Sequence, residues 1–514
     1  MGKMPLFALF KNTGNIFRKD EIGLEIAQIA LPATLALAAD PIASLVDTAF
    51  IGQIGPVELA AVGVSIAIFN QVSRITIFPL VSVTTSLVAE EDTIKRLTVE
   101  AHEEEKLEKG FATSEEMEEL ISEVECKTMT LNNISAKVEA RHERKHIPSA
   151  SSALVIGSVL GLIQTFFLIA YAKPILNYMG VNSDSPMIKP AQQYLTLRSI
   201  GAPAVLLSLA LQGIFRGFKD TKTPFYATSK KEILSPVTFV VRLIKFLLVL
   251  GDLANVILDP IFIFLFNWGV SGAAIAHVIS QYLISLILLW KLIEEVDLLP
   301  PSSKDLKFGQ FLKNGFLLMV RVIAVTFCVT LAASLAARQG STSMAAFQVC
   351  LQIWLATSLL ADGLAVAAQT ILASAFVKKD YDRATTIASR VLQLSVVLGL
   401  VLTVNLLVGL PFSSRLFTKD LKVLQLIGFI AVTQPINALA FVFDGINFGA
   451  SDFAYSAYSM VSVAVVSILC LFILSSSHGY VGIWVALSMY MSLRAIAGFL
   501  RIGSGSGPWS FLKA

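Results

Sequence analysis

The sequence has little charge for its length. Only 15% of its 514 residues are charged, 55% are hydrophobic, and the mean hydropathy is +0.71. Soluble proteins carry about 25% charged residues. Much of the charge present lies in one block, residues 91–145, so the remaining chain is almost entirely apolar. The shortage of charge excludes an ordinary soluble protein and predicts an integral membrane protein in a lipid bilayer, with no nucleic-acid partner.

Residues that commonly carry chemistry are also scarce. The chain has five histidines and four cysteines, without CxxC or zinc-site spacing. We expect reduced, structural thiols at Cys126, Cys328, Cys350 and Cys470. There is no catalytic triad pattern, Walker motif or cleavable signal peptide. We therefore expect a protein that is not an enzyme and binds no metal or cofactor, with the proton as the only candidate coupling ion.

Apolar segments long enough to cross a bilayer recur along the chain. About 20 apolar residues span the hydrocarbon core. Twelve segments meet this length: 24–52, 57–89, 150–172, 188–213, 251–268, 270–292, 309–337, 343–376, 384–410, 421–448, 453–475 and 480–502. Alternate connections are rich in Lys and Arg, which places both termini in the cytosol.

The two halves of the chain repeat. Gly213, Gly217 and Asp220 recur as Gly445, Gly449 and Asp452, an offset of 232. A second set recurs at an offset of 210: Gly269, Gly272 and Ala276 as Gly479, Gly482 and Ala486. Because the repeats lie six spans apart, both halves face the same way. The fold class predicted is all-α, with twelve transmembrane helices in two parallel six-helix repeats around a central cavity.

The repeat also sets the expected domain boundaries. The segments are a cytosolic N-terminus (1–23), an N-terminal six-helix lobe (24–292), a cytosolic linker (293–308), a C-terminal lobe (309–502) and a cytosolic tail (503–514). The first lobe contains a charged cytosolic loop, 91–149, and an atypical insertion, 229–250. Burying Arg242 and Lys245 would be costly, so we expect the insertion to remain at the cytosolic surface.

Several motifs resemble those of one transporter family. They are Val46-Asp47-Thr48, the Asn255 to Pro260 stretch and the Gly213 to Asp220 stretch, and they resemble multidrug and toxic compound extrusion (MATE) transporters. The segments Ser73 to Pro79, Arg321 to Cys328 and Asn447 to Asp452 look like the plant branch that exports citrate for aluminium tolerance and iron movement. The resemblance covers most of the chain outside the two insertions. It implies secondary transport by alternating access, at the plasma membrane.

Ionisable residues inside spans are the candidate coupling sites, because they cost several kcal/mol unless they face a cavity or a partner. Asp40 and Asp47 lie on one face of the first span, and Asn255 and Asp259 share a face of the fifth. The resemblance implies that Asp47, Asn255 and Asp259 form a proton-binding cluster. Secondary candidates are Asp362, Gln369, Asp444 and His277. Helix bracing is the alternative role for each.

Two arginines inside spans point to an anionic substrate. Arg74 and Arg321 lie one in each half, and a guanidinium group binds carboxylate through a fixed fork of donors. The alternative is an Arg–Asp pair that holds the bundle together. Polar candidates near the substrate are Asn70, Gln71, Gln352 and Gln434.

These residues favour a monomeric, proton-coupled exporter of a small organic anion, with citrate as the leading substrate. A MATE-type exporter of cationic drugs or secondary metabolites is the first alternative, which the two arginines oppose. A membrane-embedded lipid flippase or transferase is the second.

Overall fold

The structure is a computed structural model of the chain. It describes residues 20–115, 145–179, 181, 184–218, 254–297, 308–339, 341–416 and 428–513. The predicted insertion at 229–250 and about half of the predicted charged loop (116–144) lie outside the described residues, and so does Cys126.

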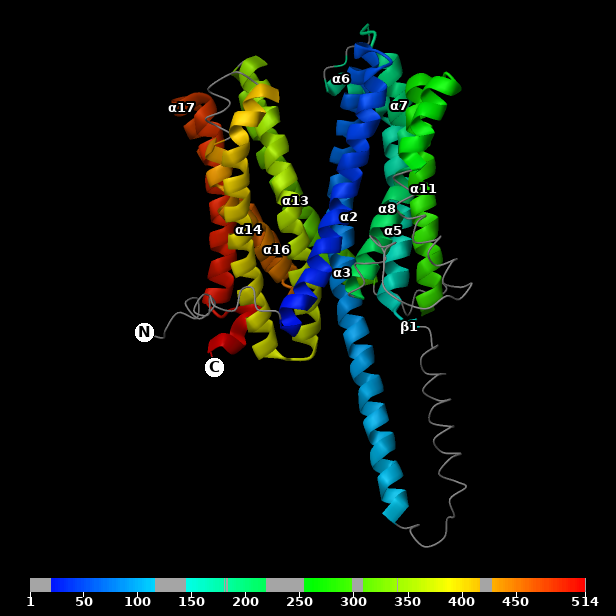
Figure 1. The fold of residues 1–514 in the computed structure, drawn as a ribbon, viewed down its shortest axis with the longest axis vertical. Coiled ribbons are helices and arrows are strands. Elements are labelled where there is room, and N and C mark those ends of the chain that lie inside the picture. Colours follow the sequence, from blue (N-terminus) through cyan, green and yellow to red (C-terminus); the bar gives the residue numbers. More distant parts are fainter. Residues whose placement is uncertain are drawn as a thin grey trace.

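Long helices make up nearly all of the described chain (Figure 1). In order they are α2 (Glu21–Gly52), α3 (Pro56–Glu115), α5 (Pro148–Ala170), α6 (Ala172–Tyr178), α7 (Ile188–Ser199), α8 (Ala202–Gly217), α11 (Gly269–Glu295), α12 (Phe308–Arg338), α13 (Ser341–Val377), α14 (Tyr381–Leu416), α16 (Gln434–Gly449) and α17 (Phe453–Gly503). Before α11, a short helix at 254–260 continues into the π-helix η2 (Ile261–Leu265), and the 3₁₀ helix η3 (Gly507–Lys513) ends the fold. Two-residue strands, β1 (Lys145–His146) and β2 (Val296–Asp297), pair in parallel.

Each of the twelve predicted spans coincides at least in part with a described helix. Seven described helices are individually long and apolar enough to cross a bilayer, or eight if α7 and α8, bent by 46°, count as one span. The count is lower than twelve because α2 is not among these helices, because α17 contains two predicted spans, and because the fifth and tenth predicted spans are only partly described. The chain is a multi-pass membrane protein.

The helices form two bundles. The N-lobe comprises α3, α5 to α8, η2 and α11, and the C-lobe comprises α12, α13, α14, α16 and α17. In Figure 1 the bundles stand side by side and diverge toward the upper end. Helix α2 serves both: Ile26 and Ile29 pack into the C-lobe core, whereas Ile51 packs in the N-lobe. The sequence assigned this span to the N-terminal lobe alone.

Two corresponding hairpins support the predicted internal repeat. Helix α17 is continuous by hydrogen bonding but reverses at Gly479, where φ is +57°. The hydroxyl of Tyr455 donates to the carbonyl of Ala497 at 2.7 Å, so the two arms run antiparallel. Gly269, the repeat partner of Gly479, starts α11 with φ of +52°. Both turns need the left-handed conformation that glycine adopts without strain.

A second pair of contacts repeats between the lobes. In the N-lobe, α8 packs on α3 through Gly213 and Gly217, and a Cβ at Gly217 would lie 2.7 Å from the Val88 side chain. In the C-lobe, α16 packs on α13 through Gly445 and Gly449, which leave equally little room. Each lobe therefore uses two glycines four residues apart to bring two helix backbones together.

The lobes meet at the end of the bundle where the described chain starts and finishes. The Gln369 side-chain amide on α13 donates to the Ser82 carbonyl at 2.8 Å and to the Ser86 hydroxyl at 2.9 Å, both on α3. The Ser86 hydroxyl in turn donates to the Phe448 carbonyl at 2.9 Å. An apolar core that includes Leu80 and Phe448 crosses the same boundary. We call these three hydrogen bonds the lobe latch.

Helix α3 and the C-terminal residues depart from the predicted boundaries. The span predicted to end at 89 continues as one helix of 60 residues, about 90 Å long at 1.5 Å per residue. It projects beyond both bundles in Figure 1. The tail predicted at 503–514 folds back as η3, with Trp509 fully buried against Phe376 and Phe511 stacked on Tyr381.

Candidate functional site

The three residues predicted as a coupling cluster come together in the N-lobe. Asp47 lies near the end of α2, while Asn255 and Asp259 share one face of the helix at 254–260. The Asn255 amide donates to Asp47 Oδ1 at 2.5 Å across 208 residues of sequence. The exposed fractions of the three are 3%, 1% and 0%, so the cluster is closed to bulk water. Asp40 lies on α2 too, but its side chain is outside the described part.

The two carboxyl groups of this cluster face each other. Asp47 and Asp259 lie within side-chain hydrogen-bonding reach. Neither oxygen of Asp259 accepts a hydrogen bond from a donor among the described residues. A hydrogen bond between two carboxyl groups requires that one of them holds a proton. The geometry can therefore bind one proton between two buried acids, which is the chemistry that a coupling site needs.

A histidine and an unpredicted arginine border the cluster. His277 Nδ1 on α11 lies 3.8 Å from Asp47 Oδ2. Arg198 on α7 is close enough to interact electrostatically with both acids, and its guanidinium donates to the Tyr194 hydroxyl at 3.0 Å. Sequence reasoning missed Arg198, although it lies in a predicted span and the criterion that selected Arg74 applies to it equally.

The C-lobe contains the opposite arrangement, two buried arginines around one acid. Arg321 on α12 and Arg494 on α17 are 2% and 8% exposed. Both contact the same carboxylate oxygen of Asp444 on α16: Arg494 Nη2 donates to Oδ2 at 2.5 Å, and Arg321 Nη2 forms an ion pair with it. We call these three residues the arginine clamp. The Arg–Asp pairing considered as the alternative role of Arg321 is thus present, with Arg494 as an additional, unpredicted member.

The clamp has more donors than its one acid can accept. Among the described residues, neither Arg321 Nε nor Arg494 Nε has a hydrogen-bond partner, and Arg321 Nη2 lies outside hydrogen-bonding geometry despite its ion pair. The guanidinium planes rest on aromatic rings, Arg321 at 5.1 Å from the Phe448 centroid and Arg494 at 5.0 Å from that of Phe441. Within the clamp two guanidinium groups share one carboxylate, and Asp362 is a second acid close enough to interact with both.

Arg74 lies on the other side of the lobe boundary. It is exposed on α3 and forms no ion pair with another described residue. One turn along α3, the Phe78 ring meets the Phe448 ring edge to face, with centroids 6.2 Å apart. The Arg321 guanidinium lies over the same Phe448 ring. The structure therefore brings the two predicted arginines to the same boundary between lobes. Asn70, one turn before Arg74, is exposed as well.

Four of the five remaining predicted residues fall into three settings. Gln71 on α3 and Gln352 on α13 are exposed. Asp362 on α13 is close enough to interact electrostatically with Arg321 and Arg494, and therefore borders the arginine clamp. Gln369 belongs to the lobe latch.

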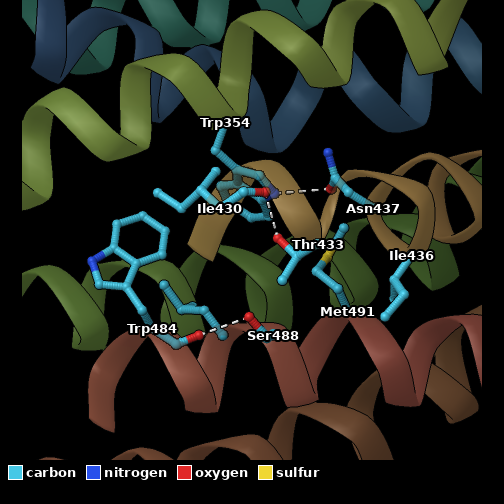
Figure 2. Close-up of a pocket in the computed structure, with 9 residues that line it drawn as sticks. Trp354, Ile430, Thr433, Ile436, Asn437, Trp484, Ser488 and Met491 are labelled. Atoms are coloured by element: carbon cyan, nitrogen blue, oxygen red, sulfur yellow. Dashed lines mark hydrogen bonds between the residues drawn. The ribbon is translucent and has the colours of Figure 1, made fainter. Parts of the chain in front are cut away.

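Gln434 lies in a separate polar network of the C-lobe. Its Oε1 accepts from Asn437 Nδ2 at 3.3 Å, and Asn437 Oδ1 accepts from Trp354 Nε1 at 2.9 Å. Figure 2 shows the Trp354–Asn437 hydrogen bond of this network on the wall of a pocket that Trp484 also lines. The fully buried Gln434 does not line the pocket itself.

Comparisons with known proteins identify relatives along nearly the whole chain. The MatE family model matches residues 134–235 and 318–473, one stretch in each half of the chain. Protein DETOXIFICATION 42 of Arabidopsis thaliana is 63% identical, over 99% of this chain and 97% of its own. Protein DETOXIFICATION 43 of the same plant is 53% identical, over 99% and 96%.

Solved structures share the fold. A crystal structure of MATE in the bent conformation superposes with a TM-score of 0.74 at 18% identity, over 99% of this chain and 98% of that one. A straight conformation superposes with a TM-score of 0.73 at 18% identity, over 97% and 98%.

Proposed function

This chain belongs to the MATE family of secondary transporters, and we propose that it exports a small organic anion, with citrate as the leading substrate, in a proton-coupled cycle. Members of this family are transporters and not enzymes. The choice of an anion rests on one observation, the contrast between the two lobes. The N-lobe buries a pair of facing acids, whereas the C-lobe buries two arginines that both contact one acid, Asp444, with Asp362 nearby.

The contrast assigns proton binding to the N-lobe and anion binding to the C-lobe. A buried acid pair binds a proton readily but offers no donors to an anion, whereas guanidinium groups bind carboxylates through paired donors. Arg74 adds a third cation at the lobe boundary, unpaired among the described residues. A cationic substrate would meet these positive groups on its way between the lobes, which opposes the alternative of a cationic-drug exporter.

Coupling would pass through α2. This helix carries Asp47 at its N-lobe end and packs against α13 of the C-lobe along its first half. Proton binding between Asp47 and Asp259 would therefore change the packing of a helix that both lobes share. The lobe latch closes one end of the bundle here, and alternating access would require it to open.

We further propose a plasma-membrane protein that functions as a monomer with both termini in the cytosol. The start of α2 and η3 both contact the first turns of α14, Asp20 through Arg390 and Phe511 through Tyr381. Their position at one end of the bundle supports an even number of crossings. Impermeant labelling of a cysteine at exposed Tyr178, from outside intact cells, would support this orientation; labelling of one at Ser504 instead would contradict it.

Transport in proteoliposomes tests the proposal. Purified protein should move radiolabelled citrate faster with an imposed pH gradient than without one. Asp259→Asn and Asp47→Asn should each remove the effect of the gradient, because an amide cannot exchange a proton. Asp452→Asn is the matched control, a buried C-lobe acid hydrogen-bonded to Arg501 at 2.6 Å. Gradient-driven citrate flux in either N-lobe variant would contradict the coupling role.

Arg74 tests the anion role separately. Arg74→Ala should weaken citrate transport by about 10- to 150-fold in apparent affinity, because a charged hydrogen bond contributes about 1.5–3 kcal/mol. Its membrane level should not change, since no described ion pair is lost. Uptake of organic cations in place of citrate would support the cationic-drug alternative.

A further inference from the structure

We propose that Asp444 is a tethered carboxylate that occupies the substrate's place in the arginine clamp, and that a small hydroxycarboxylate displaces it during transport. The inference rests on the proposed function and names the site that the anion would occupy. It also assigns Arg494 a direct role in binding the anion.

The first argument is the unequal pairing of donors and acceptors within the clamp. Arg321 and Arg494 both contact Asp444 Oδ2, and no described residue donates to Asp444 Oδ1. A single carboxylate commonly binds one guanidinium through both oxygens. Here one oxygen serves two guanidinium groups, and each guanidinium keeps an Nε donor without a partner among the described residues. An incoming carboxylate with two free oxygens could accept from both arginines at once.

The second argument is the unmet hydrogen-bonding capacity at the same place. The Nε donors of both arginines lack partners among the described residues, and so does the acceptor Asn447 Oδ1. Asn447 is only 4% exposed, so water does not readily satisfy it. Buried donors and acceptors without partners are costly, so these groups indicate a site for a ligand with matching polar atoms.

The third argument is the space beside the clamp. Asp444, Arg494 and Asn447 line one small pocket between α16 and the two arms of α17; Arg321 does not line it but contacts Asp444. In this conformer a ligand carboxylate would therefore take the place that the Asp444 carboxylate vacates. Donors from the two arginines that contact Asp444, with an acceptor from Asn447, match a ligand that has both a carboxylate and a hydroxyl group.

Asp444 would keep the arginines paired whenever the substrate is absent. Two buried cations without a counterion are strongly destabilising, so an empty clamp needs an internal anion. A substrate carboxylate would replace that anion without changing the charge at the two guanidinium groups. The lobe would therefore remain stable both before and after the anion leaves.

Binding measurements on the purified full-length protein test this role. Asp444→Asn removes the internal competitor but keeps the side-chain size, so citrate should bind about tenfold or more tightly than to the wild type, as seen by calorimetry. The matched control is Asp452→Asn, which removes the acid of another C-lobe ion pair, with Arg501, and should leave citrate affinity unchanged. Adding Arg494→Gln to Asp444→Asn should reverse the gain. Unchanged or weaker citrate binding by a folded Asp444→Asn variant would overturn the proposal.

A second variant covers the case in which Asp444→Asn does not fold. Arg494→Lys keeps the charge but loses the planar fork, and should weaken citrate binding about tenfold in the wild-type background. Unchanged citrate binding by this variant would overturn the proposal as well. Tricarballylate, which lacks the hydroxyl of citrate, should bind the wild type more weakly, because Asn447 would lose its partner; equal binding would refute the hydroxyl contact.

These tests separate the clamp from the proposed transport cycle. The same panel includes dicarboxylates, so tighter binding of malate in place of citrate by Asp444→Asn would support the clamp while contradicting citrate as substrate. Clamp-dependent binding without pH-driven flux would contradict only the coupling. Flux of citrate with an Asp444→Asn affinity equal to wild type would instead refute only the displacement of Asp444.

Discussion

Replacing Gln369 by leucine should shift the balance between the two lobe arrangements. Leucine has nearly the same size, so the change removes the two hydrogen bonds to Ser82 and Ser86 without leaving a cavity. At about 0.5–1.5 kcal/mol for each bond, the latch weakens by about 1–3 kcal/mol. The ratio between the conformer described here and the one open at the latch end should then change by about 5- to 150-fold.

Spin labels at Tyr178 and Ser477 provide the readout. Both residues are exposed, Tyr178 at the end of α6 in the N-lobe and Ser477 beside the α17 hairpin in the C-lobe, at the end opposite the latch. Pulsed double electron–electron resonance should show a larger fraction of short distances between the two labels in Gln369→Leu than in the wild type. Gln164→Leu is the matched control, because Gln164 donates to the Ser73 hydroxyl at 2.5 Å within one lobe. Identical distance distributions for Gln369→Leu and the wild type would refute the reasoning.

Two further predictions concern stability in detergent. Gly445→Ala should lower the unfolding midpoint, because its Cβ would collide with the backbone of Ala365 and overpacking costs about 1–3 kcal/mol. Gly315→Ala is the control and should not lower the midpoint, because no atom lies within 4 Å of its Cβ. Equal midpoints for the two variants would contradict the packing. The Arg390 side chain and the Gly23 N–H, both donating to Asp20, hold the Asp20 pKa at about 2 instead of 3.8. This stabilisation is complete well above pH 3.8 and is lost progressively as pH falls from 3.8 through 2. Asp20→Asn should therefore lower the midpoint equally at pH 5.5 and 7.5, and an unequal loss would count against the pairing.

Several features of the fold could be predicted because they depend on local composition. Long apolar runs require helices in lipid, since only a helix satisfies its own backbone within a single segment. The repeated glycines could be found for a similar reason. Gly269 and Gly479 are needed for their positive φ, and Gly445 is needed for a close approach of two helices. The residue type itself therefore indicates the backbone geometry at these positions.

Helix ends were predicted less well, because composition indicates where the chain leaves the lipid and not where a helix ends. Charged residues beyond 89 indicate that the chain leaves the lipid, yet charged residues are compatible with a continuing helix, and α3 extends to Glu115. The short tail contains no apolar run, yet Trp509 and Phe511 dock against Phe376 and Tyr381. Such docking depends on a surface that only the folded C-lobe provides.

By itself, the sequence determined that this protein crosses a membrane many times, that its halves repeat, and which ionisable residues must lie inside spans. It could not determine their partners, because the face that a helix presents is periodic in sequence but its neighbour depends on packing. Tertiary structure placed Asp259 against Asp47 and joined Arg321 to Asp444 and Arg494, residues separated by more than one hundred positions along the chain. It thereby put an acid pair in one lobe and a cationic clamp in the other, because a charge buried in low dielectric is stable only beside a group that compensates it.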